Sequence, residues 1–96
     1  ITYNNSRNKL SDTEIKTNFK ILIKELENNI KEHEDDVQNY LYLSAILNKA
    51  AQYNPTYLDD VIKWCKKALP LSPTRPQIYF EMGQAETSRG NFDKAI

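Results

Sequence analysis

The chain has 96 residues, and its 13 basic and 13 acidic residues give a formal net charge of zero. A chain of this length forms one small domain that buries only about 60–65% of the surface of its unfolded state. The charge balance offers no basic excess for a nucleic-acid backbone, no apolar run is long enough to span a bilayer, and one cysteine excludes an internal disulfide.

The first predicted helix covers residues 12–33. Residues 1–11 are polar and aperiodic, and we expect them to form a flexible N-terminal segment. The sequence Ser11-Asp12-Thr13-Glu14 matches a capping box, in which serine and glutamate side chains each satisfy a free backbone donor. Apolar residues then recur at helical spacing and predict one amphipathic stripe: Ile15, Phe19, Leu22, Ile23, Leu26 and Ile30.

A short acidic turn follows, His33-Glu34-Asp35-Asp36, and it contains the only histidine. One histidine among carboxylates makes a metal site conceivable, but transition metals require several convergent nitrogen or sulfur ligands. We therefore interpret the turn as a solvated segment whose acids favour the start of the next helix. No phosphate-binding glycine loop or nucleophile triad is visible, so we predict no metal, cofactor or catalytic residue.

The second predicted helix, residues 36–51, is apolar on more than one side, which is typical of a helix packed between neighbours. A loop over residues 52–56 leads to a third helix that starts near Tyr57. Pro70 should end that helix early, because proline disfavours helix in the residue before it.

The last part of the chain is predicted to be helical as well. Thr74 and Gln77 form a second capping box, which opens a helix over residues 75–89. Gly90 is expected to close it, and Asn91 to cap a short final helical stub. No stretch alternates as a strand does, so the predicted fold class is all-α.

The sequence also repeats itself. Residues 38–44 align with residues 77–83 at an offset of 39, with glutamine, tyrosine, two large apolar residues and a small residue in the same positions. Residues 58–62 align with residues 92–96 at an offset of 34, so the loop before Leu58 is the longer of the two. Two helices per unit and one variable loop are typical of a helical solenoid.

This pattern resembles the tetratricopeptide repeat. The family's aromatic, leucine and small residue on its first helix match Tyr40, Leu43 and Ser44, then Tyr79, Met82 and Gly83. The small residues, Ser44 and Gly83, are expected to let the paired helix approach closely. The small or apolar residues of the family's second helix match Val61, Cys65, Ala68 and Ala95, and its closing proline matches Pro73.

The resemblance also divides the chain into repeats. Residues 12–33 would belong to a preceding repeat, residues 36–75 would form a complete repeat, and residues 76–96 a truncated one. Glu86, Pro70 and the long loop depart from the family pattern.

The resemblance implies a non-catalytic scaffold that binds a protein or peptide in a concave groove lined by first helices. Carried onto this chain, the groove positions are Gln38, Leu41, Ala45, Asn48, Lys49, Gln77, Phe80, Gln84, Thr87 and Ser88. The variant that clamps acidic chaperone termini needs lysine and asparagine where this chain has Leu41, Ala45 and Gln84. The groove is therefore expected to suit an uncharged or mixed segment.

Two other functions stay open. The apolar faces of Tyr79, Met82 and Phe92 would lack a covering helix, which favours self-association or packing within a larger assembly. Residues 57–79 also resemble repeats appended to bacterial O-antigen ligase-related membrane proteins. That resemblance would make the chain, which begins without methionine, an accessory piece of a polysaccharide-handling parent.

The remaining notable side chains are interpreted as packing or surface residues. Cys65 is predicted to be an inert core thiol, because a reactive one needs an activating base and an exposed, electropositive setting. Lys63, Trp64, Lys66 and Lys67 are interpreted as a solvated face, with Trp64 a partner anchor if it is exposed. The predicted core is Tyr40, Leu43, Leu47, Val61, Ile62, Cys65, Ala68, Tyr79 and Met82.

Overall fold

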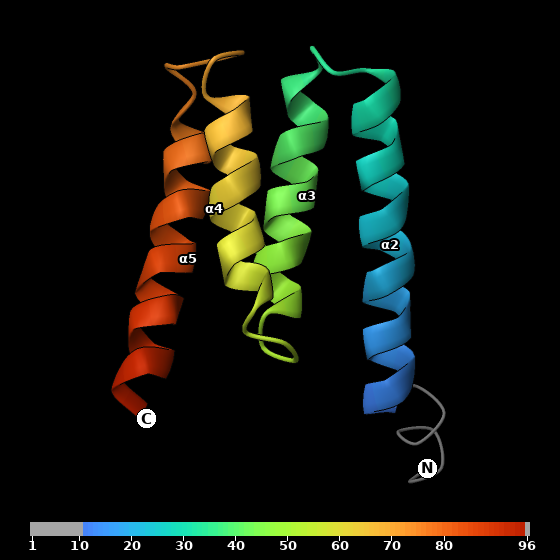
Figure 1. Ribbon diagram of the computed structural model, residues 1–96, viewed down its shortest axis with the longest axis vertical. Coiled ribbons are helices and arrows are strands. Elements are labelled where there is room, and N and C mark those ends of the chain that lie inside the picture. The colour runs from blue at the N-terminus through green and yellow to red at the C-terminus, as the bar shows by residue number, and fades with distance from the viewer. Residues whose placement is uncertain (1–10, 96) are drawn as a thin grey trace, which may run out of the picture.

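The computed structural model describes the backbone of residues 11–95 and the side chains of residues 11–90. Within that range the chain forms four helices and no strand, which confirms the all-α prediction (Figure 1). The helices are α2 (Asp12–Glu32), α3 (Val37–Ala50), α4 (Tyr57–Ala68) and α5 (Pro76–Ala95). The segment predicted to be flexible, residues 1–10, lies outside the described residues.

Local side-chain caps start the first two helices. The backbone N–H of Glu14 donates to Ser11 Oγ at 3.2 Å, and the serine hydroxyl donates to the Glu14 carboxylate at 3.1 Å. The N–H of Gln38 donates to the Asp36 carboxylate at 3.0 Å and starts α3. Both starts lie within one residue of their predicted positions, because each depends on a cap within the same turn.

The start of α5 lies within one residue of its predicted position, but the residue that caps it differs. The helix begins at Pro76, and the N–H of Ile78 donates to the Arg75 carbonyl at 3.2 Å. Proline suits the first helical position, since its missing N–H would have no partner inside the helix. Among the described residues, the Gln77 N–H does not bond to the Thr74 hydroxyl and the Thr74 N–H does not bond to the Gln77 side chain, so the second capping box was wrongly predicted.

The end of α5 differs as well. Gly90 does not close the helix, which continues to Ala95, and no glycine among the described residues has a positive φ. Glycine permits a left-handed cap but does not require one, and inside a helix it costs only about 1 kcal/mol relative to alanine. The stub predicted after Asn91 is therefore the last turn of α5, and the side chains of residues 91–96 lie outside the described range.

Consecutive helices run antiparallel, and α3 lies in the middle of the array (Figure 1). Helix α3 packs against α2 and α4 and also contacts α5, while α5 packs mainly against α4. This position explains why α3 is apolar on several sides. Its buried residues are Tyr40, Leu41, Leu43, Ser44, Leu47 and Ala50.

Most of the predicted core is buried, but its last part is not. Tyr40, Leu43, Leu47, Val61, Cys65 and Ala68 are all buried. Ile62 and Met82 are half-buried and pack against this core. Tyr79, however, is 54% exposed, and α5 instead buries Ile78 and Ala85. Leu22 of the predicted α2 stripe is also exposed, whereas Ile23, Leu26 and Ile30 are buried.

The turns before α3 and α5 have the same hydrogen bonds at the sequence offset of 39. In each, a tyrosine hydroxyl donates to a carbonyl six residues earlier: Tyr40 to Glu34 at 2.9 Å, and Tyr79 to Pro73 at 2.7 Å. Four backbone hydrogen bonds of the first turn also recur in the second. The N–H of His33 donates to the carbonyls of Asn29 and Ile30, that of Asp36 to His33, and that of Asn39 to Asp36. At the offset of 39, the N–H of Ser72 donates to Ala68 and Leu69, that of Arg75 to Ser72, and that of Ile78 to Arg75. The turn that leads into α3 is thus repeated in the turn that leads into α5, so α3 and α5 are equivalent helices.

Candidate functional site

A hollow of about 360 Å³ lies between the C-terminal half of α3 and the middle of α5. Its lining residues are Ala45, Asn48, Lys49, Gln52, Phe80, Glu81 and Gln84. Five of these were predicted groove positions. Gln52 and Glu81 were not, although each lies one helical turn from a predicted position, which is a signal that sequence periodicity contains.

A second hollow, also about 360 Å³, continues along α5. It is lined by Tyr79, Phe80, Gly83, Gln84, Thr87 and Ser88. Phe80 and Gln84 line both hollows, so the two form one continuous surface, which we call the α3–α5 groove. Phe80 is 65% exposed at the junction.

Three predicted groove residues lie elsewhere. Leu41 is only 5% exposed, so its side chain belongs to the core and not to the groove surface. It lies on the same side of α3 as Gln38 and Asn48. Gln38 accepts a hydrogen bond from Arg75 at 3.4 Å, and Asn48 donates one to Glu81 of α5. This side of α3 faces α5, which explains the burial of Leu41. Gln38 is half-buried by its contact, and Gln77 is exposed but lines neither hollow.

A buried acceptor without a partner lies in the groove. The Asn48 amide nitrogen donates to the backbone carbonyl of Glu81 at 3.2 Å and to its carboxylate at 2.7 Å. The amide oxygen, Oδ1, is buried and has no hydrogen-bond partner among the described residues. Turning the amide over would place this oxygen against two acceptors, so the network determines its orientation. A buried acceptor left unpaired costs about 1–3 kcal/mol.

The groove carries charges of both signs and an aromatic ring. Lys49 is exposed on one side, and Glu81, half-buried on the other, is held by Asn48. Such a surface offers hydrogen bonds and an apolar contact without a strong net charge. This arrangement can bind a ligand. The lining residues do not place a nucleophile beside a general base, as catalysis would require.

Cys65 lies away from the groove, in the core. It is fully buried, and its thiol donates to Ser44 Oγ at 3.4 Å. Burial is the largest influence on the pKa of this thiol and raises it, the hydrogen bond to Ser44 lowers it, and the charge of Glu81 raises it further. The resulting pKa is above the ordinary value, which is the opposite of what a nucleophilic cysteine needs.

Trp64 is half-buried and its ring is already in contact with other side chains. It packs against Tyr40 with a centroid separation of 6.0 Å. The ammonium groups of Lys63 and Lys67 lie 5.1 and 4.9 Å from the ring centroid, within range of a cation–π interaction. These contacts account for the position of the Trp64 ring beside Lys63 and Lys67.

The acidic turn at residues 32–36 is exposed on all its side chains. Across the described range, no group of three or more histidine, cysteine or carboxylate side chains is placed to hold a metal ion. In the same range, no helix combines the length and the apolar character needed to cross a membrane.

Comparisons of the chain with protein-family models, with curated proteins and with solved structures found no match. The candidate site therefore rests on the groove itself and on the internal repeat that builds it.

Proposed function

We propose that this chain is a tetratricopeptide-like interaction module that binds an extended peptide segment in the α3–α5 groove without catalysing a reaction. The proposal draws on the repeated unit, whose two turns share their hydrogen bonds at the offset of 39. It also draws on the contact between α3 and α5, which are the first helices of successive units and border one groove.

Phe80 is the observation that carries the proposal. Its side chain is 65% exposed where the two hollows join, although an aromatic ring in water is a cost that burial removes. Exposed aromatic residues at the centre of a concave surface are the usual anchors of protein interfaces. A partner covering both hollows would bury this ring.

The polar groups of the groove favour an extended backbone as the ligand. Asn48 lines the hollow and holds the Glu81 carboxylate in place through its amide nitrogen. The neighbouring Glu81 carboxylate and Lys49 ammonium provide an acceptor and a donor on opposite sides of the same hollow. An extended segment with unpaired N–H and C=O groups and mixed side chains meets these requirements.

The test is a peptide selection followed by calorimetric titration. A peptide chosen from a random displayed library against the whole chain is titrated against Phe80→Ala and, as a matched control, Tyr42→Ala. Tyr42 is an aromatic residue on α3 with 54% exposure that lines neither hollow. We expect Phe80→Ala to weaken binding by about 1–3 kcal/mol and Tyr42→Ala to leave it unchanged. Loss of binding with Tyr42→Ala alone would place the interface on another surface.

Self-association is the second candidate, because Tyr79 and Phe80 are neighbouring residues exposed by 54% and 65% on the same helix. If this face joins two copies, the mass measured by light scattering rises with concentration, and Phe80→Ala abolishes the rise. A mass that stays monomeric while a peptide binds favours the groove. The resemblance to O-antigen ligase-related repeats stays a prediction about the parent protein and is compatible with either use.

A further inference from the structure

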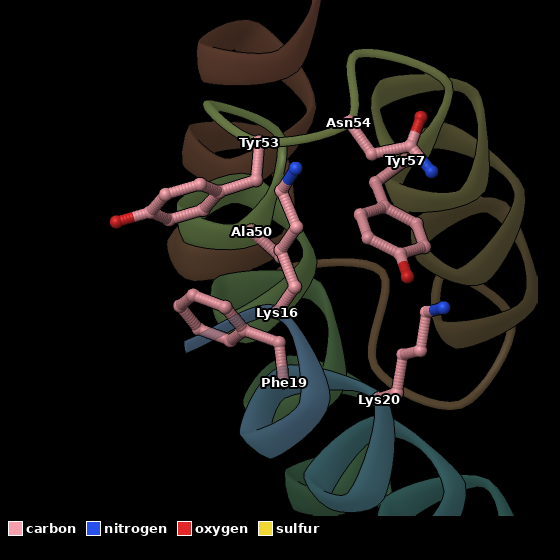
Figure 2. Close-up of a pocket in the computed structure, with 7 residues that line it drawn as sticks. All are labelled: Lys16, Phe19, Lys20, Ala50, Tyr53, Asn54 and Tyr57. Carbon is pink, nitrogen blue, oxygen red and sulfur yellow. The ribbon is translucent and has the colours of Figure 1, made fainter. Parts of the chain in front are cut away.

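A separate hollow of about 180 Å³ lies where the N-terminal half of α2 meets the α3–α4 loop (Figure 2). Both segments lie at the same end of the molecule (Figure 1). The lining residues are Lys16, Phe19, Lys20, Ala50, Tyr53, Asn54 and Tyr57. None of them lines the α3–α5 groove, so we treat this α2–loop pocket as an independent site.

The walls of the pocket are aromatic. The rings of Phe19 and Tyr53 lie 5.9 Å apart, tilted by 44°, and both are half-buried. Tyr57 is half-buried on the other side, and the buried Ala50 lies between them. The apolar lining is therefore suited to one apolar group inserted between rings.

The loop side of the pocket is held in place by local hydrogen bonds. The backbone N–H groups of Tyr53 and Asn54 donate to the Ala50 carbonyl at 2.9 and 3.2 Å. The Asn54 side-chain oxygen accepts from the N–H and the hydroxyl of Thr56 at 3.2 and 2.6 Å. This is the stretch that is longer than its counterpart in the sequence repeat, and it forms the loop wall of the pocket.

Two lysines one turn apart on α2 border the aromatic walls. Lys16 and Lys20 are exposed, and both side chains extend toward the loop residues (Figure 2). The salt bridge found within the described residues joins Arg89 to Asp59, and neither lysine takes part in one there. Like charges at i and i+4 repel each other, and a carboxylate placed beside both would relieve the repulsion.

The size and charge of the pocket indicate its ligand. Sites for small organic ligands usually measure roughly 300–1,000 Å³, so a volume of about 180 Å³ fits a single side chain better than a whole cofactor. The apolar walls fit an aliphatic or aromatic side chain, and the two ammonium groups, which form no ion pair among the described residues, complement carboxylates next to it. Both features occur together in an acidic peptide segment with one apolar residue.

We propose that the α2–loop pocket binds an acidic peptide segment of a partner protein. One apolar side chain of that segment inserts between the rings of Phe19, Tyr53 and Tyr57. Carboxylates flanking it in the peptide lie beside the ammonium groups of Lys16 and Lys20. The site does not depend on the α3–α5 groove, which takes a segment of mixed polarity.

The probe for this site is the fluorescently labelled peptide Asp-Asp-Leu-Asp-Asp, whose anisotropy is measured with the whole chain at low salt. Replacing its leucine by serine tests the apolar insertion without altering the protein. The variant Lys16→Glu with Lys20→Glu tests the charges. Its matched control is Lys24→Glu with Lys31→Glu, which makes the same change in net charge on exposed residues of the same helix outside the pocket. Circular dichroism verifies that both variants are helical.

We expect the leucine peptide to bind, and the serine peptide and the Lys16/Lys20 variant each to reduce affinity at least about tenfold. The Lys24/Lys31 control and Phe80→Ala should leave affinity within about twofold. Backbone amide shifts measured by nuclear magnetic resonance should concentrate at Phe19, Tyr53 and Tyr57. Absence of binding, equal losses in both charge-reversed variants, or shifts centred on Phe80 would each overturn the proposal. The last outcome would leave the groove proposal standing.

Discussion

At the scale of single residues, two neighbours on one helix turn can lie in very different environments. Cys65 and Trp64 are adjacent in α4, yet the thiol is fully buried while the indole lies at the surface between two lysines. The Ser44 hydroxyl donates to the Tyr40 carbonyl at 2.8 Å, which leaves its lone pairs to accept from Cys65. In this arrangement the thiol is the donor, and its pKa is raised because burial outweighs the lowering by the hydrogen bond to Ser44.

The Cys65 thiol should therefore be unreactive in the native protein. We expect it to react with Ellman's reagent on the order of 100-fold more slowly than in the urea-unfolded chain, because reaction requires opening of the core. Folding disfavours the thiolate, so this contribution to stability is complete below the ordinary pKa of 9.0 and is lost as pH rises through the raised value. Native reactivity equal to that of the unfolded chain would show that the core is open.

At the scale of elements, α5 differs from its counterpart α3 because fewer helices surround it. Tyr79 and Gly83 correspond to Tyr40 and Ser44 at the offset of 39. Tyr40 and Ser44 are buried, whereas Tyr79 and Gly83 are exposed. The expectation that Gly83 allows close approach of a paired helix is wrong for the described residues, since a Cβ added there would meet no atom within 4 Å.

Replacing Gly83 by alanine should consequently stabilise the protein. The substitution removes backbone freedom from the unfolded chain and meets open space in the folded one, so we expect a gain of about 0.5–1 kcal/mol. Gly90, also in α5, should behave in the same way, because a Cβ added there would likewise meet no atom within 4 Å. Urea denaturation measures both. Destabilisation by Gly83→Ala alone would mean that a partner or second copy packs against this point.

At the scale of the whole molecule, α3 joins the other three helices, and its central residues have the greatest effect on stability. Leu43 is fully buried in the core cluster that spans all four helices. Its neighbour Tyr42 points away from that cluster and is 54% exposed. The two positions form an internal comparison between a core residue and a surface residue on one turn.

Leu43→Ala should destabilise the protein by about 2–5 kcal/mol, because it removes apolar contacts and leaves a cavity. That loss is a large share of the stability of a small domain. Tyr42→Ala should change the free energy of unfolding by no more than about 0.5 kcal/mol. Denaturation midpoints report both, and similar midpoints for the two variants would contradict the observed orientation of α3.

Much of the fold was predictable because its signals are local. The cap at Ser11, the cap at Asp36 and the helix-ending Pro70 each act within a few residues, and the helix boundaries near them agree with the structure. Local sequence patterns predicted the two ends of α5 less reliably, as Pro76 and Gly90 show. Helix α5 begins at Pro76 without the predicted Thr74 cap, and a glycine that permits a cap did not impose one.

The sequence by itself determined that the chain is helical, where three of its four helices begin and end, and that residues 38–44 of α3 recur as residues 77–83 of α5. Only the tertiary structure decided which of two equivalent residues is buried. Leu41 is covered on the side of α3 that faces α5, while the equivalent Phe80 is exposed. The α2–loop pocket likewise required the packing of segments more than 30 residues apart. Burial depends on neighbouring helices in space, and a residue pattern along one helix does not contain that information.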